Sequence, residues 1–201
     1  MVDRKAWLEE IVEGNLFEDL RNTNRVNANF VTALALSAYT EALGGLINGD
    51  LTDTANTKAN YRTFLERMGY SQSESLRYYK MVRCGLTHAI FIKGPRSSVG
   101  KVALGEKRGI VERDGGIFFI IQNYMVEFQS AFARYKEDLL NNVGNLQQMF
   151  DQAMAGSTQP EDARKIFDPS LVASFPSTSY SGGALVFVPI MGPMPPSTEH
   201  P

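Results

Sequence analysis

Residues 26–47 constrain the fold more than any other part of the chain, because this segment is apolar on nearly every side of a helix. A helix that is hydrophobic all round needs other elements to cover all of its faces. We therefore expect it to be the central helix of a bundle, ended by a turn at 48–50. Its apolar residues include Phe30, Val31, Leu34, Leu36, Tyr39, Leu43, Leu46 and Ile47.

Four more helices are expected around the central one, because apolar residues recur at helical spacing in four other segments. Thr23 and Asn24 interrupt the first of these and can cap the central helix that follows. Gly69 ends the third helix in chain order, and Ser71 or Ser73 begins the fourth. The predicted ranges are residues 4–21, 56–68, 74–86 and 124–154.

Residues 89–121 break the helical pattern between the fourth and fifth helices. The Asp-Gly-Gly sequence at 114–116 lies there between two apolar runs, and this arrangement predicts a tight antiparallel hairpin. An Ile-Phe-Ile run at 90–92 is a further apolar stretch of the insertion. The basic segment 95–108 is expected to be a mobile loop.

Composition changes after Gly156, because eight of the nine prolines lie beyond it among Ser, Thr and Gly residues. Proline-rich segments cannot continue a helix and pack poorly. We expect a mainly α fold over residues 1–156, an up-and-down helical bundle with a small antiparallel β-hairpin insertion. Residues 157–201 are expected to form a loosely structured Pro/Ser-rich tail, in which the apolar run 184–188 is a candidate strand or docking segment.

The chain of 201 residues has one cysteine, Cys84, and two histidines, His88 and His200. A single cysteine excludes an intrachain disulfide and a multi-cysteine zinc site, and we expect no metal and no cofactor. We also expect no membrane association, because the uninterrupted apolar stretches fall short of the ~20 residues that span a bilayer. Acidic residues occupy the N-terminal region where a secretory signal would carry its apolar core, so a cytoplasmic location is expected.

Charge is distributed unevenly along the chain, although the formal net charge is only −2. Residues 57–113 hold twelve Lys and Arg side chains against four Glu, and the flanking regions are acidic. A basic middle between acidic flanks could bind a polyanion, or the opposite charges could pair within the chain or between subunits.

Two short motifs suggest chemistry that the neighbouring residues do not support. The segment GPRSSVGK at 94–101 resembles a phosphate-binding loop, but its glycines stand one residue too far apart and Val102 replaces the magnesium-binding Ser or Thr. Cys84 and His88 are four residues apart and could form a thiolate dyad on one helix face. No third group that would orient the histidine is evident, so a small buried thiol is favoured.

Arg83 lies within the apolar stripe of the fourth helix, whose members are Leu76, Tyr79, Val82 and Leu86. Because burying an unpaired guanidinium is costly, we expect Arg83 to pair with Glu41, a carboxylate inside the apolar central helix. His88 points well away from this stripe and stands near the expected end of the fourth helix. It could act as a general acid or base, or simply satisfy the last helix carbonyls.

The order of these elements and two motifs resemble the HEPN superfamily. The first motif is YTEALGG at residues 39–45, towards the end of the central helix, and the second is RCGLTH at 83–88. The second matches the hallmark of the superfamily, which is an Arg followed after four to six residues by a His near the end of a late bundle helix. The resemblance covers roughly residues 5–155 and is to a small bacterial member.

This resemblance implies a helical bundle that forms a homodimer, in which two motifs face one cleft. Many members are metal-independent endoribonucleases of toxin–antitoxin, phage-defence or RNA-processing systems, so RNA and a protein antitoxin are the implied partners. Carried over, His88 would assist attack of a ribose 2′-hydroxyl on the adjacent phosphate or protonate the leaving oxygen. Arg83 would stabilise the charge that gathers on the phosphate, and Glu41 would support Arg83.

The basic middle of the chain suits RNA, and the expected RNA-binding residues are Arg77, Lys80, Lys93, Arg96 and Lys101. Active members of the superfamily usually carry a polar residue directly after the motif arginine, where this chain has Cys84. Two functions therefore follow: an RNA-binding protein with metal-independent cleavage, and a non-catalytic HEPN-like dimeric scaffold or interaction module. An open basic cleft favours the first, and a buried Arg83–Glu41 pair with a remote His88 favours the second.

Overall fold

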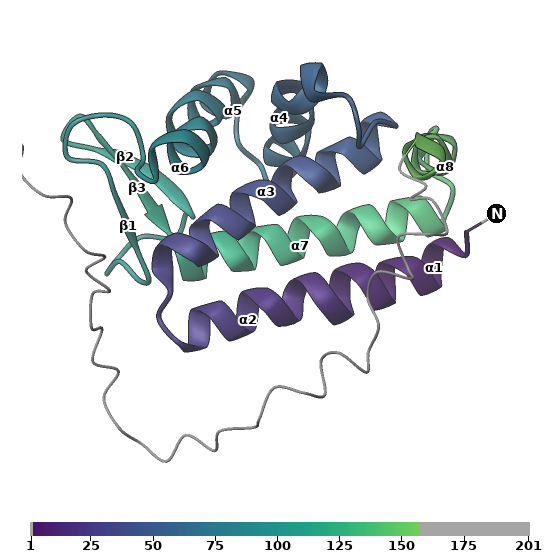
Figure 1. Cartoon of the computed structure of the whole chain (residues 1–201), viewed down its shortest axis with the longest axis horizontal. Coiled ribbons are helices and arrows are strands. Elements are labelled where there is room, and N and C mark those ends of the chain that lie inside the picture. Colours follow the sequence, from purple (N-terminus) through teal and green to yellow (C-terminus); the bar gives the residue numbers. More distant parts are fainter. Residues whose placement is uncertain (1, 157–201) are drawn as a thin grey trace, which may run out of the picture. The chain divides into compact units, whose positions relative to one another are not determined.

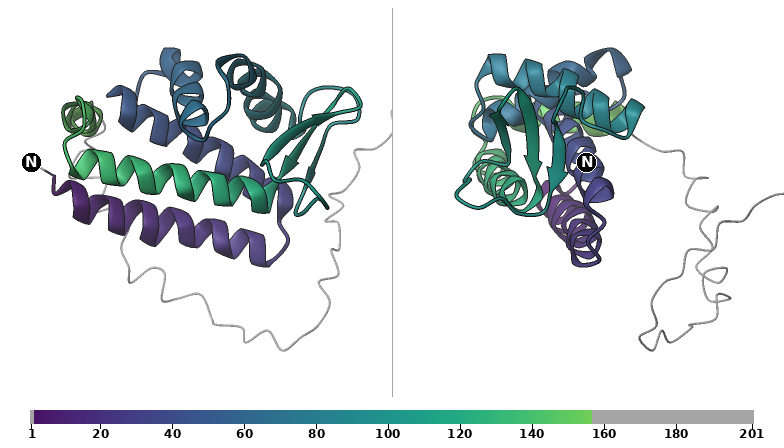
Figure 2. Two further views of the ribbon diagram at one scale, coloured as in Figure 1. Left: turned by 180° about the vertical axis from the view of Figure 1, so that it is seen from behind. Right: turned by 90° about the vertical axis from the view of Figure 1, so that its left-hand side faces the viewer.

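A computed structural model of the chain describes residues 2–156, and this part is mainly helical with one small sheet (Figure 1). Three helical stretches run side by side along its length, while the sheet lies at one end and the last helix at the other (Figures 1 and 2). The Pro/Ser-rich tail predicted for residues 157–201, with its apolar run at 184–188, lies outside the described residues.

Several of the helices join end to end without a break in the helical backbone. η1 and η3 are π-helical turns, and η2 is a short 3-10 helix. The helical segments are α1 (Arg4–Trp7), η1 (Leu8–Leu16), α2 (Phe17–Arg25), α3 (Asn29–Asn48), η2 (Thr54–Asn56), α4 (Thr57–Arg67), α5 (Gln72–Tyr78), η3 (Tyr79–Arg83), α6 (Cys84–Ala89), α7 (Ile121–Leu140) and α8 (Leu146–Gly156). The strands are β1 (Ser98–Gly100), β2 (Ile110–Arg113) and β3 (Gly116–Ile120).

Helix α3 is the central helix that the sequence predicts, since it contacts α2, α4, α6, α7 and α8. The expectation of burial on all faces is wrong for its first turns, where Phe30, Val31 and Leu34 are 44%, 55% and 40% exposed. The helix also begins at Asn29, later than predicted, because Asn27 adopts a left-handed backbone that ends the preceding turn.

Close contact between α3 and α4 depends on a residue without a side chain. A Cβ atom placed on Gly44 would lie 1.8 Å from the carbonyl oxygen of Asn60. The same α4 residue ties down the connection between the two helices, because Asn60 Nδ2 donates a hydrogen bond to the Asp50 carbonyl at 2.9 Å. The pair of glycines near the end of α3 therefore fixes how closely these two helices approach.

Aromatic side chains fill the core between α2, α4 and α7. Phe17 of α2 packs edge-on against Phe128 and Phe132 of α7, with ring centroids 6.0 and 5.2 Å apart. Phe64 of α4 contacts the Phe128 ring from another side at 5.2 Å. All four rings are buried, so this cluster joins three segments that are distant in sequence.

The prediction of one long helix over residues 124–154 is wrong, because two helices occupy this range. α7 ends at Leu140 and α8 begins at Leu146. Asn142 and Gly144 between them both have positive φ angles, 57° and 61°, and a helix cannot continue through left-handed residues. The break lets α8 pack across the end of α3, where the sulfur of Met149 approaches Gly49.

The insertion between α6 and α7 forms a three-stranded sheet with the order β1-β3-β2. β2 and β3 pair antiparallel through a two-residue turn in which Asp114 and Gly115 both have positive φ, as a tight hairpin requires. β1 pairs parallel to β3, so the expectation of a mobile loop is wrong for Ser98–Gly100. The apolar run at 90–92 is not a strand.

A partly buried carboxylate attaches this sheet to the bundle. Glu127 of α7 accepts hydrogen bonds from the Tyr70 hydroxyl at 2.6 Å and from the Gly109 amide at 3.1 Å. Tyr70 in turn accepts the Ile110 amide at 2.9 Å, while Arg108 pairs with Glu127 at 2.9 Å. Burial raises the pKa of Glu127 and outweighs the lowering effect of these partners.

Of the described helices, only α3 is long and apolar enough to cross a membrane by length and composition. Its apolar residues are interrupted by Thr32, Ser37, Thr40 and Glu41, and the expectation of no membrane association stays a prediction. Half of the relevant stretch, 50%, is buried against the rest of the fold, and core helices of soluble proteins meet the same criteria.

Candidate functional site

The side chains of Arg83 and Glu41 form a two-point ion pair, as the sequence predicts. Arg83 Nε donates to Glu41 Oε2 at 2.6 Å, and Nη2 donates to Oε1 at 3.1 Å. The two side chains are only 19% and 18% exposed. Burial acts to lower the pKa of Arg83, but the hydrogen bonds and charge of Glu41 reverse this, and the net shift is upward. Nη1 of Arg83 makes no hydrogen bond within residues 2–156.

Arg83 is the last residue of the π-helical turn η3, and the same helix continues as α6 to His88. Tyr79 begins this turn, and its hydroxyl lies 2.9 Å from Thr57 Oγ1 of α4. Its ring also packs at 5.8 Å from that of Tyr61. π-helical turns occur frequently at functional sites. Here the turn and its contacts with α4 hold Arg83 over α3.

His88 is not brought to the Arg83–Glu41 pair within the single chain. It lies on the last turn of α6 and is exposed. Residues five apart on an ideal helix are offset by about 140°, so Arg83 and His88 point in different directions. No hydrogen bond or ion pair joins His88 to any other residue of the described range. Cys84 is partly buried with a free thiol, and no contact joins it to His88.

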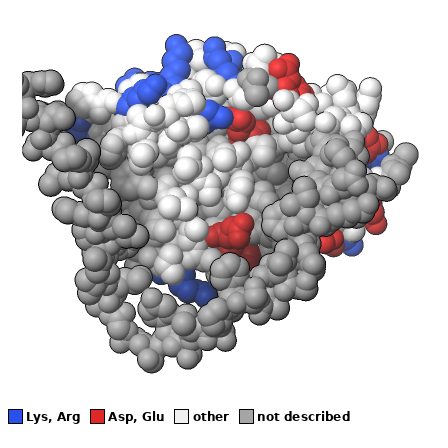
Figure 3. Space-filling view, viewed as in Figure 1, with Lys and Arg blue, Asp and Glu red and all other residues white. Residues whose placement is uncertain are grey.

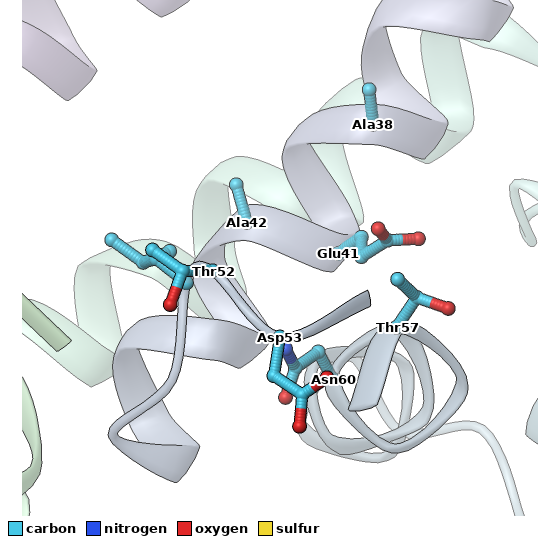
Figure 4. Close-up of a pocket in the computed structure, with 8 residues that line it drawn as sticks. Ala38, Glu41, Ala42, Thr52, Asp53, Thr57 and Asn60 are labelled. Atoms are coloured by element: carbon cyan, nitrogen blue, oxygen red, sulfur yellow. The ribbon is translucent and has the colours of Figure 1, made fainter. Parts of the chain in front are cut away.

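An open pocket of about 190 Å³ borders Glu41 (Figure 4). Ala38 and Ala42 of α3 form one wall, and Thr57 and Asn60 of α4 contribute to the other. The Glu41 carboxylate points towards Thr57 across this opening (Figure 4). Asp53 adds a second carboxylate, so the pocket disfavours a phosphate group. Among residues 2–156 no three His, Cys, Asp or Glu side chains are grouped to hold a metal ion.

The five expected RNA-binding residues fall into two groups. Lys80, Lys93 and Arg96 are exposed and make no hydrogen bond or ion pair within the described residues. Arg77 pairs with Glu112 at 3.0 Å, and Lys101 Nζ donates to the Asn27 side chain and to the Asn24 carbonyl. Five further cations of the basic middle are also paired with carboxylates: Arg62, Arg67, Arg83, Arg108 and Arg113.

The chain after α6 turns back along its own helix and thereby brings the Lys93 backbone against Met81, the residue that follows Lys80. The Lys93 amide donates to the Met81 carbonyl at 2.9 Å. This return path needs Gly85, because a Cβ atom there would lie 2.4 Å from the Phe91 carbonyl oxygen. The backbone of the segment that carries Lys93 and Arg96 is thus held next to the helix that carries Lys80.

Figure 3 shows Lys and Arg side chains along the edge over α5 and α6. We call Lys80, Lys93 and Arg96 the basic edge. Their exposure and lack of partners leave these three charges available to an external anion, unlike most of the other cations in the basic middle of the chain.

Two exposed aromatic residues near the basic edge were missed by the sequence reasoning. From the sequence, Phe30 is expected to lie in a helix buried on all sides, and Phe91 in an apolar run of the β insertion. In the structure their rings contact each other, with centroids 6.0 Å apart, and both are exposed. The signal in the sequence was the pair of cations at 93 and 96 just after an aromatic residue.

Comparison of this chain with protein-family models, with curated proteins and with solved structures finds no match.

Proposed function

We propose that this chain is a HEPN-like protein that binds RNA through the basic edge. The observation that carries the proposal is the set of three exposed, unpaired cations, Lys80, Lys93 and Arg96, in a chain where most neighbouring cations are paired. Unpaired surface cations bind phosphates and release counterions, and this gives RNA binding its affinity and its salt dependence. Arg83, held by Glu41, keeps the helix that carries Lys80 in place on α3.

Metal-independent cleavage is the second candidate function, and the exposure of His88 favours it. An imidazole that is free of internal partners can give or take a proton, and His88 lies on the helix that carries Lys80. In this reaction the 2′-hydroxyl attacks the adjacent phosphate, and His88 takes the proton from it or gives one to the leaving oxygen. Arg83 keeps Nη1 free for the phosphate while it holds Glu41.

A non-catalytic dimeric scaffold is the remaining alternative, and the separation of His88 from the Arg83–Glu41 pair favours it over cleavage. In this case Arg83 is a structural residue and two copies associate without forming a cleavage site. RNA binding and cleavage therefore need separate measurements.

The first experiment measures binding of a fluorescent mixed-sequence RNA by anisotropy over a range of salt concentrations. A triple variant, Lys80→Gln, Lys93→Gln and Arg96→Gln, is expected to bind at least tenfold more weakly. Because each single-strand phosphate contact contributes about 0.7 to the salt slope, the slope should fall by about 2. Lys58→Gln is the matched control, since Lys58 is an exposed cation of α4 without an ion pair within residues 2–156.

The second experiment incubates the wild-type protein with the same RNA in EDTA. Cleavage is supported if the wild type produces fragments with 2′,3′-cyclic phosphate ends and the His88→Ala variant does not. Binding without fragments supports the scaffold that binds RNA. Equal affinity of the wild type and the triple variant contradicts the proposed RNA surface.

A further inference from the structure

An exposed apolar surface lies next to Lys93 of the basic edge. Its members are Phe30, Val31 and Leu34 from the start of α3 and Ile90 and Phe91 from the turn after α6. Ile90 and Phe91 are 69% and 64% exposed. The rings of Phe30 and Phe91 meet edge to face, with centroids 6.0 Å apart and an angle of 86° between their planes.

The turn that presents Phe91 is strained and tightly fixed. Ile90 caps α6 with a left-handed backbone, φ 64°, which a β-branched residue rarely adopts. The next residues are held against α6 at Gly85 and by the hydrogen bond from the Lys93 amide to the Met81 carbonyl. Strain of this kind, in an exposed apolar residue, is a feature of sites that serve a function.

The charges around this surface identify the class of ligand. Lys93 follows Phe91 by two residues, and His88 precedes it by three. On the other side, Lys101 Nζ is anchored at 2.7 Å from Asn27, just before α3 and Phe30. Lys93 has no carboxylate partner within residues 2–156. Aromatic faces beside cations are the arrangement that binds single-stranded nucleic acid, because bases stack on the rings while phosphates meet the charges.

We propose that Phe30 and Phe91 form a stacking platform for the bases of single-stranded RNA, next to the basic edge and His88. This inference rests on the proposed function and names its substrate class. A paired duplex hides its base faces, so it meets the cations but cannot use the platform. Single-stranded RNA therefore binds more tightly than duplex RNA, and the difference depends on the aromatic rings.

The test compares a short fluorescent oligouridine with its duplex on oligoadenosine, by anisotropy at one salt concentration. Stacking on one aromatic side chain accounts for between about fivefold and about 150-fold in affinity. Phe91→Leu, which keeps an apolar side chain but removes the ring face, weakens binding of the single strand within this range and leaves duplex binding unchanged. Phe91→Trp keeps the affinity of the wild type.

Val126→Ala is the matched control, because Val126 is an apolar residue of α7 with the same exposure of 64%. It should leave binding unchanged, and thermal unfolding confirms that all variants are folded. Equal affinity for single strand and duplex, together with no effect of Phe91→Leu, overturns the platform while the RNA-binding function stands.

Absence of all RNA binding by the wild type instead overturns the proposed function and the platform with it. The wild type and the Phe91 variants are also tested for binding to anionic lipid vesicles and for self-association. If either interaction survives Phe91→Leu but is lost in Phe91→Asp, the apolar surface serves a different partner, and this result also overturns the platform.

Discussion

A double-mutant cycle on the Arg83–Glu41 pair measures how much this ion pair contributes to the free energy of unfolding. Exposed ion pairs contribute about 0.2–1 kcal/mol, whereas removing one partner of a buried pair costs about 3–5 kcal/mol. With side chains 19% and 18% exposed and two hydrogen bonds, this pair lies closer to the buried limit. We therefore expect a coupling energy of about 2 kcal/mol between the two residues.

The single variants should differ in their effect. Glu41→Leu leaves the Arg83 guanidinium, whose side chain is only 19% exposed, without its carboxylate partner, so we expect a loss of about 3 kcal/mol in the free energy of unfolding. Arg83→Met leaves the Glu41 carboxylate, but that group borders an open pocket and water can reach it, so the loss should be about 2 kcal/mol. The double variant should lose no more free energy of unfolding than the less stable of the two single variants.

Urea unfolding followed by circular dichroism measures all four proteins under one set of conditions. His88→Ala serves as the control and should change stability by less than about 0.5 kcal/mol, because His88 is exposed and makes no contacts within the described residues. Single losses that add within about 0.5 kcal/mol in the double variant would refute the reasoning.

Three further predictions concern stability. Gly44→Ala should destabilise the protein by about 3 kcal/mol or more in urea unfolding, because its Cβ would overlap the Asn60 carbonyl, whereas Gly14→Ala should cause no such loss. Ile90→Asn should raise the free energy of unfolding by about 1 kcal/mol, since Asn tolerates the left-handed backbone, and an unchanged or lower value contradicts the strain. The raised pKa of Glu127 means that its folded form binds a proton more tightly than the unfolded form. The stability of the wild type relative to Glu127→Gln should therefore be highest below the ordinary pKa of 4.5 and fall as the pH rises through the raised pKa. Parallel stability curves for these two proteins from acid to neutral pH would show that Glu127 does not titrate differently on folding.

The sequence predicted the helix ends that are set by residues close to one another in the chain. Ser71 begins α5 through a capping box with Glu74, and a left-handed Gly69 follows α4, both within reach of a few residues. The Arg83–Glu41 pair was also predictable, because a cation in an apolar stripe needs a carboxylate and the central helix offers one. The break near Asn142 had a signal too, an Asn-Asn-Val-Gly-Asn sequence at 141–145, but helical periodicity on both sides concealed it.

The sequence by itself determined a mainly helical chain, a central apolar helix and a basic middle region, because helical periodicity, capping and charge are properties of neighbouring residues. Only the tertiary structure decided which cations stay free, since partners such as Glu112 for Arg77 and Glu127 for Arg108 come from distant segments. It also decided the parallel pairing of β1 with β3, which no local pattern encodes. The exposure of Phe30 also depends on the tertiary structure. In a helix that is apolar on every face, the packing of the neighbouring elements decides which face is exposed to solvent.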